Sequence, residues 1–456
     1  MEKIMRVLLW LTLFVIPIFA STTAYVELSL EKAIEILKSE NLEVNVARFD
    51  EQIKEYEHEL ALADNYGKLD FVQTAMRSND AGNVFGFKLE SREASFGDFG
   101  FSEFDGTNPN ILNVQPKDLN YPDARSHFQT KLQYQLPIYT GGKLEQYGKI
   151  TKALQELSVI DTQKILSEKL YQLKKSYYDI YLLNTYIHNL NIINKNMDRL
   201  EMMAQSMINE GYAKRIDLLE VQSKKANVVR MTSKAEANKE LVYHFISFLL
   251  NTKVKSVSGN EKEIELKEYS IDTILQNNLD IKKAKQGLSV TQMAIDLHKA
   301  SNLPEIGAFA EYGSSDNTFL GDFTDHDAYT FGVQLRWNIF SGGASSNSIE
   351  KARVENLKVQ KQVSLAQKGI ILQVEKINTE IKSYNFDIES LKKEIELTRS
   401  IYKNYLGRYQ EKLVSINDVI IKQSLEIEKV LKLNEVQNSR TSKILELDKI
   451  ANGDSK

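Results

Sequence analysis

The sequence contains two copies of one long unit. In the first copy, a strand-like segment that ends in a glycine pair, LPIYTGGK at 136–143, precedes a long periodic run and a polar turn, EGYAKRIDLL at 210–219. In the second copy, WNIFSGG at 337–343 precedes a similar run and EKLVSINDVI at 411–420. The chain is therefore expected to fold as a tandem repeat.

The interval between these landmarks is the same in both copies. Asp217 lies 76 positions after Gly141, and Asp418 lies 76 positions after Gly342, so the copies are offset by 201. An interval kept over this distance indicates that the length of the intervening helix is constrained.

The repeat extends to the start of each unit, where Asn41 corresponds to Asn278 at an offset of 237. Because the offset then falls to 201, the first copy carries 36 extra residues, which we place in a loop at about 78–126. The second copy has only about 314–327 there. We predict four parts: a signal peptide at 1–24, a first repeat at 25–251, a linker or equatorial segment at 252–268 and a second repeat at 269–456.

The N-terminus has the pattern of an export signal. Lys3 and Arg6 precede an apolar stretch at 7–19, which has the length of a signal core and is short for a membrane-spanning helix. We expect cleavage after Ala24, with Ala20 as the second choice; the alternative is an uncleaved anchor. No later run of about 20 apolar residues follows, so the sequence predicts an exported envelope protein.

Composition and motifs argue against several functions. The net charge of -4 does not favour a nucleic-acid partner, and the absence of cysteine excludes disulfides and thiolate metal sites. The six histidines are scattered, and no metalloprotease, phosphate-loop or serine-hydrolase motif occurs. His326 lies between two aspartates, which fits a weak metal site but better fits a solvated loop. We predict no enzymatic activity, no cofactor and no metal.

Two segments of about a dozen residues, 128–138 and 329–339, alternate apolar or aromatic with hydrophilic residues. Shorter partner strands are expected at 69–76 and 306–312. Alternation alone is typical of a soluble, half-buried sheet. The strand length, the aromatic strand ends and the export signal favour a transmembrane β-barrel instead.

Long helices complete each unit. The run 143–207 would span about 100 Å as a helix, with return helices at 216–250 and 418–451. A helix at 28–62 is expected to break at Asn41, and no proline interrupts a long helix. A coiled-coil seam is predicted from residues at alternating spacings of three and four: Leu190, Ile193, Met197, Leu200, Ala204 and Met207, then Val374, Ile377, Ile381, Tyr384, Ile388, Leu391 and Ile395.

Four strands cannot close a barrel in a membrane, because about eight is the smallest number known and open strand edges are not tolerated in lipid. The chain must therefore pool its strands with other copies. A dimer would supply eight strands and a trimer twelve.

The repeated strand ends, the glycine pairs and the two aspartate turns resemble those of the TolC-type outer membrane efflux proteins over nearly all of the mature chain. The resemblance implies a mostly α-helical homotrimer with a 12-stranded barrel in outer membrane lipid and a coiled-coil tunnel in the periplasm. It also implies a periplasmic adaptor (membrane fusion) protein and an inner-membrane transporter as partners. The implied function is passive conduction of substrates out of the cell, in efflux or in type I secretion.

The resemblance also implies a gate at the periplasmic tip, with acidic residues at the constriction. Asp217 and Asp418 match the first acidic position of the two turns. The second acidic position is Ile421 in the second copy and Glu220 in the first, so an acidic ring would use Glu220. The alternative, which is compatible with a gate, is that Asp217 is a helix N-cap and Glu220 closes a capping box.

The turns are also the implied contact with the adaptor. The residues expected to contribute are Gly211, Tyr212, Leu413, Val414 and Ser415. The tip glycine of the first turn is replaced by Lys412 in the second, which makes the second turn's geometry and contacts less certain.

The glycine pairs are expected to mark the passage from strand to helix. These strand–helix junction residues are Gly141, Gly142, Gly342 and Gly343. A periplasmic coiled-coil adaptor or scaffold without a channel is the alternative function, although it does not explain the aromatic strand faces. A simple diffusion porin is a third option, disfavoured by the few strands and the long helices.

Overall fold

The computed structural model describes residues 26–258 and 264–451. The predicted signal peptide lies outside the described residues. Within these residues, none of the helices combines the length and apolar character needed to cross a bilayer.

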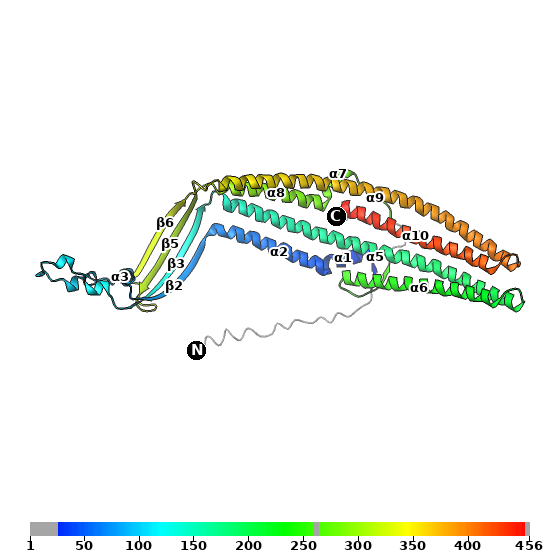
Figure 1. Cartoon of the computed structure of the whole chain (residues 1–456), viewed down its shortest axis with the longest axis horizontal. Coiled ribbons are helices and arrows are strands. Elements are labelled where there is room, and N and C mark those ends of the chain that lie inside the picture. The colour runs from blue at the N-terminus through cyan, green and yellow to red at the C-terminus, as the bar shows by residue number, and fades with distance from the viewer. Residues whose placement is uncertain (1–25, 259–263, 452–456) are drawn as a thin grey trace, which may run out of the picture. The chain divides into compact units, whose positions relative to one another are not determined.

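The elements follow the repeated order expected from the sequence (Figure 1). The first repeat contains β1 (Val26–Ser29), α1 (Leu30–Glu40), α2 (Leu42–Ala63), β2 (Lys68–Ser78), β3 (Arg125–Tyr139), α5 (Lys143–Asn209) and α6 (Arg215–Leu249). Strand β4 (Val254–Ser258) follows in the predicted linker. The second repeat contains α7 (Ile271–Asn277), α8 (Leu279–Ala300), β5 (Glu305–Asp316), β6 (Asp327–Arg336), α9 (Ala344–Gln410) and α10 (Ile416–Ala451). The chain is mostly helical with a small sheet, as predicted.

The constraint on helix length is confirmed. Helices α5 and α9 each contain 67 residues, and both their first and last residues are 201 apart. The predicted seam is buried along both helices, with Leu190, Leu200 and Ile377 at most 1 % exposed. Burying such an aliphatic side chain stabilises a fold by about 1.5–3 kcal/mol, so the seam supplies much of the energy that holds these helices together.

The described chain divides into two compact units, each of which contains parts of both repeats. One comprises residues 26–45, 165–258, 264–270 and 372–451, and the other comprises 46–164 and 271–371. Helices α5 and α9 run through both units.

In the first unit, strand β1 pairs in parallel with β4. The sequence indicated helix from residue 28 and an irregular linker after 251, and both predictions were wrong at these short strands. Isolated strands of four and five residues carry too little pattern to be recognised. The predicted break at Asn41 is correct: its side chain donates to the Leu249 carbonyl oxygen over 2.8 Å and accepts from the Val44 amide over 3.0 Å.

In the second unit, the four long strands form one antiparallel sheet in the order β2-β3-β5-β6 (Figure 1). Strands β2 and β6 are therefore its edges. Strand β6 ends at Arg336, whereas the sequence pattern predicted strand to 339; residues 337–340 are irregular. Strand β6 ends where its partner does, because Arg336 pairs with Glu305, the first residue of β5. The alternation of apolar and polar residues continues beyond this last pair.

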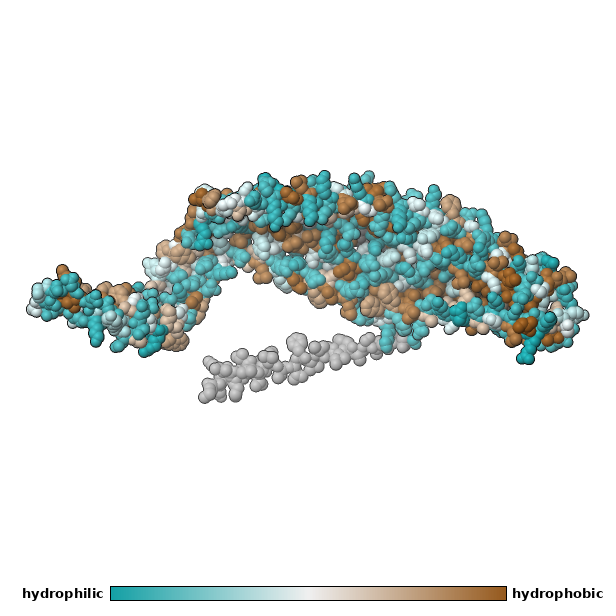
Figure 2. All heavy atoms as spheres, in the orientation of Figure 1, coloured by the Kyte–Doolittle hydropathy of each residue, from teal (hydrophilic) through white to brown (hydrophobic). Residues whose placement is uncertain are grey.

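The register places most of the apolar residues of the four strands on one face. One row across the sheet reads Leu69, Tyr134, Ala310 and Phe331. Much of this face is exposed, with Phe331 at 75 %, and Figure 2 shows hydrophobic residues on the visible surface of the molecule. The opposite face is mostly polar; there Gln133 donates to Glu311 over 2.9 Å.

The loop between β2 and β3 contains two short helices, α3 (Ala81–Glu90) and α4 (Lys117–Asn120). Three 3₁₀ turns lie between them, η2 (Phe96–Phe99), η3 (Phe101–Glu103) and η4 (Ile111–Asn113), and another, η1 (Asp64–Tyr66), precedes β2. The loop is 46 residues long, against 10 between β5 and β6, which confirms the predicted excess of 36.

Candidate functional site: the two helix turns

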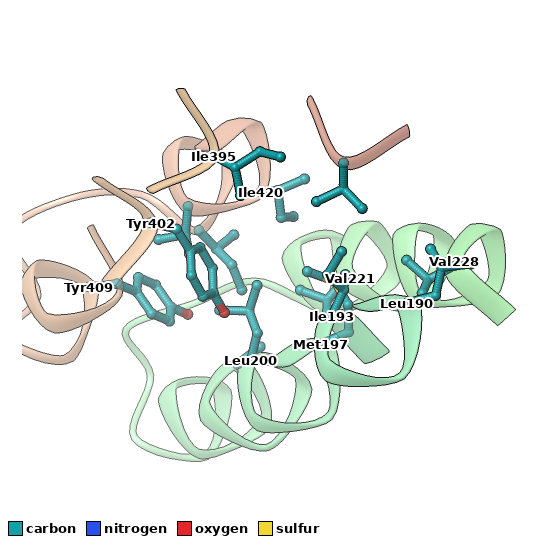
Figure 3. Close-up of a cluster of buried hydrophobic side chains, with 14 of the residues drawn as sticks. Leu190, Ile193, Met197, Leu200, Val221, Val228, Ile395, Tyr402, Tyr409 and Ile420 are labelled. Atoms are coloured by element: carbon teal, nitrogen blue, oxygen red, sulfur yellow. The ribbon is translucent and has the colours of Figure 1, made fainter. Parts of the chain in front are cut away.

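The two turns, at 210–214 and 411–415, connect α5 to α6 and α9 to α10 in the first unit (Figure 1). Behind them lies a hydrophobic cluster formed by all four helices. Figure 3 shows Met197 and Leu200 of α5, Val221 of α6, Tyr402 of α9 and Ile420 of α10 within it, and all five are buried. The turns therefore rest on a shared core contributed by both repeats.

The two turns have the same backbone despite their different sequences. Gly211 has φ +81° and Lys412 has φ +62°, so both occupy the left-handed region. The Tyr212 amide donates to Met207 and the Leu413 amide to Arg408, the equivalent carbonyl oxygen 201 positions later. The lysine does not alter the turn, although a non-glycine residue costs about 1–2 kcal/mol in this conformation. The doubt about the geometry of the second turn is thereby removed.

The Lys412 side chain reaches across to the first turn. Its Nζ lies 3.4 Å from the centroid of the Tyr212 ring and 3.5 Å from Glu210 Oε2. A cation over an aromatic face contributes about 0.5–1 kcal/mol at an exposed site. This contact was not predicted from the sequence, although a lysine at a position that requires a left-handed backbone was the available signal.

Two of the three predicted gate carboxylates, Asp217 and Asp418, stabilise the helix starts. Asp418 forms a complete capping box, because its Oδ2 accepts from the Ser415 amide over 3.0 Å and Ser415 Oγ accepts from the Asp418 amide over 3.2 Å. In the first turn, Asp217 Oδ2 accepts from the Lys214 amide over 2.7 Å, but Lys214 offers no side-chain acceptor in return.

The capping roles assigned from the sequence were therefore wrong in position. Lys214, not Asp217, occupies the N-cap, and Asp217 is the third helical residue. Glu220 lies further along α6 and does not close the box; its Oε2 is buried without a hydrogen-bond partner among the described residues. The equivalent Ile421 is exposed. The exchange of Lys214 for Ser415 between copies was the signal for the true box.

The electrostatics of the second turn follow from its hydrogen bonds. Donation by the Ser415 hydroxyl and amide lowers the pKa of Asp418 below its usual value, and Lys422 and Arg408 add to the effect. Asp418 is thus held in its charged form by the turn itself.

The residues expected to contact the adaptor are not equally accessible. Tyr212 and Leu413 are exposed, whereas Val414 packs against the hydrophobic cluster. Ser415 is engaged in the capping box. Gly211 is exposed at the left-handed position.

The strand–helix junctions have the geometry that glycine allows. Gly141, Gly142, Gly342 and Gly343 all have φ between +60° and +86°. A Cβ atom on Gly141 would lie 2.6 Å from the Ala300 carbonyl oxygen, so no other residue fits there without a shift. The Lys143 amide donates to Thr140 and the Ala344 amide to Ser341, which repeats the same turn at the offset of 201.

The alternative metal site at His326 has few ligands. His326 Nδ1 lies 3.2 Å from Asp316 Oδ2. Within 26–258 and 264–451, no group of three or more histidine, cysteine or acidic side chains is arranged to hold a metal.

Comparison with known proteins identifies the class. Residues 270–453 match the family of outer membrane efflux proteins, and no curated protein matches. The fold is shared with the outer membrane channels CmeC of Campylobacter jejuni (TM-score 0.74, 13 % identity, covering 93 % of this chain and 85 % of that one) and MtrE of Neisseria gonorrhoeae (0.72, 13 %, 94 % and 92 %). It is also shared with VceC of Vibrio cholerae (0.73, 13 %, 92 % and 95 %).

The second repeat matches the family of outer membrane efflux proteins in sequence, and the chain shares the fold of these outer membrane channels. The resemblance to the TolC-type family, the predicted class of function and the outer membrane location are thereby confirmed. The family is one of transport channels and not of enzymes.

Proposed function

We propose that three copies of this chain form a 12-stranded barrel in the outer membrane, continued by a helical tunnel into the periplasm. The observation that carries the proposal is the sheet itself. Its two edges, β2 and β6, have no partner strand within the described chain, and one of its faces is an exposed apolar surface. Such a sheet is tolerated in lipid only when its edges are closed, and three copies match the assembly of the family.

The exposed helix surfaces support the same assembly. Helix α2 carries an unburied stripe at spacings of three and four, made by Val46, Phe49, Ile53, Tyr56 and Leu60. Helix α9 exposes Val354, Leu357 and Leu365 near its start. Because α2 leads into β2 and α9 follows β6, pairing β6 with the β2 of a neighbouring copy brings these two stripes together.

The assembly is tested by the variant Phe49→Asp/Tyr56→Asp, with Glu55→Asp/Glu59→Asp on the polar positions of α2 as the matched control. We expect heat-sensitive trimers in outer membrane fractions of the control and their loss in the variant. A native protein recovered as a soluble periplasmic monomer would contradict the channel and favour the scaffold alternative.

Within this channel, the two turns form the periplasmic tip, where a periplasmic adaptor protein docks and an inner-membrane transporter delivers the substrate. Tyr212 and Leu413 are the principal contact residues because their side chains are exposed. Gly211, Val414 and Ser415 shape the turns that present them. The glycine pairs mark the level at which barrel becomes tunnel, and the two repeats occupy 25–251 and 269–456, joined by 252–268.

The carboxylates of Asp217, Glu220 and Asp418 make the tip selective for cations, because a trimer brings three copies of each together. Asp217→Asn and Glu220→Gln remove charge and keep hydrogen-bonding groups, so both should lower the permeability ratio of cations to anions. Ile421→Glu adds the carboxylate that the second copy lacks and should raise it. Reversal potentials in planar bilayers measure the ratio; equal values in all three variants and the native channel would contradict the acidic tip but not the trimer.

A further inference from the structure

The 46-residue loop between β2 and β3 is a folded module. The carboxylate of Glu103 accepts from the amides of Lys117 and Asp118 over 2.9 and 2.8 Å, which joins η3 to α4. Lys88 forms an ion pair with Asp98 and lowers the pKa of Asp98 to about 2. These contacts connect the beginning and the end of the module to its middle, so the module is folded and not extended.

The module is also anchored to the sheet. The Phe87 ring of α3 stacks on the His127 ring of β3, with centroids 4.2 Å apart and planes 6° from parallel, and both side chains are buried. Glu93 forms an ion pair with Arg125 at the start of β3. These contacts hold the module next to the start of β3, at the end of the sheet away from the strand–helix junctions (Figure 1).

The module exposes large apolar side chains. Leu112 is 94 % exposed, Phe96 83 % and Tyr121 79 %, and Phe101 and Phe104 are also exposed. The Phe96 and Phe101 rings contact edge to face with centroids 6.2 Å apart. These five side chains are called the apolar loop surface below. A monomer in water rarely exposes a group of this kind unless it is a contact site.

We propose that the apolar loop surface is a contact between copies of this chain, through which three modules meet over the outer mouth of the barrel. The proposal rests on the proposed trimer. Strand β2 is a sheet edge, so the module begins at Ser78 directly beside the neighbouring copy. The trimer places three such modules around one axis, alternating with the short 10-residue loops.

Charge disfavours the membrane surface as the partner. Residues 79–124 contain eight acidic and three basic side chains, so the module is repelled by anionic lipid headgroups. Repulsion between modules is reduced by local partners: Glu93 and Asp98 lie in ion pairs with Arg125 and Lys88. Asp80, Glu103 and Asp105 accept backbone amides of their own module.

The absence of cysteine from the chain allows a direct test. Leu112→Cys and Phe96→Cys each place one thiol on the apolar loop surface, and Leu320→Cys places one on the exposed short loop as the matched control. Non-denaturing electrophoresis first verifies that all variants form trimers. Mild oxidation should then link chains of the two module variants in pairs through disulfides, whereas chains of the control should stay unlinked.

If trimers form but neither module variant is cross-linked, or the control is cross-linked equally, the proposed contact between modules is wrong. The proposed trimer would not be affected by that result. Absence of trimers in the native protein would overturn the proposed function itself. A blue shift of an environment-sensitive fluorophore on Leu112→Cys when the trimer enters lipopolysaccharide vesicles, without cross-links, would assign the surface to lipid.

A second variant, Phe96→Ser/Phe101→Ser/Leu112→Ser, keeps the module and removes its apolar groups. We expect its single-channel conductance to be higher than that of the native channel, because the modules no longer meet over the mouth. An unchanged conductance would contradict closure of the mouth by this surface.

Discussion

The two turns at the helix tips share a backbone and differ in chemistry. The first has Gly211 at the left-handed position, Lys214 at the N-cap and Glu220 behind it; the second has Lys412, Ser415 and Ile421 at the same places. Three backbone hydrogen bonds, donated by the amides of residues 210–212 in the first turn and 411–413 in the second, nevertheless correspond at the offset of 201. The comparison shows that helix length and backbone path are held constant between the repeats, whereas the side chains at the tip are free to specialise.

The largest effect is expected when the helices of one repeat are made shorter than those of the other, for example in the hairpin formed by α9 and α10. Deleting one heptad from each arm of the second hairpin, 396–402 and 423–429, withdraws its turn by about 10 Å and keeps the phase of the seam. We expect loss of the shared core behind the turns, with a sharp fall in the temperature at which trimers dissociate on electrophoresis.

The matched control deletes 195–201 and 222–228 as well, which shortens both hairpins alike. Its trimers should be more heat-stable than those of the single-hairpin deletion, because the turns lie level again. If both deletions behave alike, the equal interval is not a constraint on assembly.

A smaller effect is expected from the capping box that only the second turn has. Ser415→Ala removes the side-chain half of the box and should cost about 1 kcal/mol in local stability, whereas Lys214→Ser should stabilise the first turn by creating that half. Hydrogen exchange of the amides at the starts of α6 and α10 measures both effects. If Lys214→Ser stabilises the first turn as much as Ser415→Ala destabilises the second, the capping residue alone accounts for the difference in local stability between the two helix starts.

The same box gives the second turn a defined dependence on pH. The pKa of Asp418 is lowered in the folded turn, so its contribution to stability is present above the unfolded pKa of about 4. That contribution is lost as the pH falls through the lower folded value. Exchange at the Ser415 amide should therefore accelerate only under strongly acidic conditions, and Ser415→Ala should move that acceleration to higher pH.

The smallest effect is expected at Lys412. Lys412→Gly relieves a left-handed conformation that costs about 1–2 kcal/mol but removes a contact with Tyr212 that contributes about 0.5–1 kcal/mol, so its thermal stability should stay close to that of the native protein. Lys412→Ala keeps the strain and loses the contact. It should be the less stable of the two variants by differential scanning calorimetry, and the reverse order would contradict the strain assigned to the left-handed position of residue 412.

Much of the fold could be read from the sequence because its signals are long and repeated. The 67-residue helices, the seam from Leu190 to Met207 and the glycine junctions were all predicted, since periodicity over many residues and left-handed glycine turns are local properties. Strands β1 and β4 were missed because four or five residues show no reliable period. The end of β6 was misplaced because strand length depends on the pairing partner.

The candidate site was predicted less completely. The sequence alone determined the tandem repeat, the equal helix lengths and the positions of both turns, because these depend on spacing and backbone preference. Only the tertiary structure decided that Lys214 is the N-cap, that Glu220 stands apart from it and that Lys412 binds Tyr212 and Glu210. These outcomes depend on which side chains meet when two distant turns are brought together, and no local pattern encodes such a meeting.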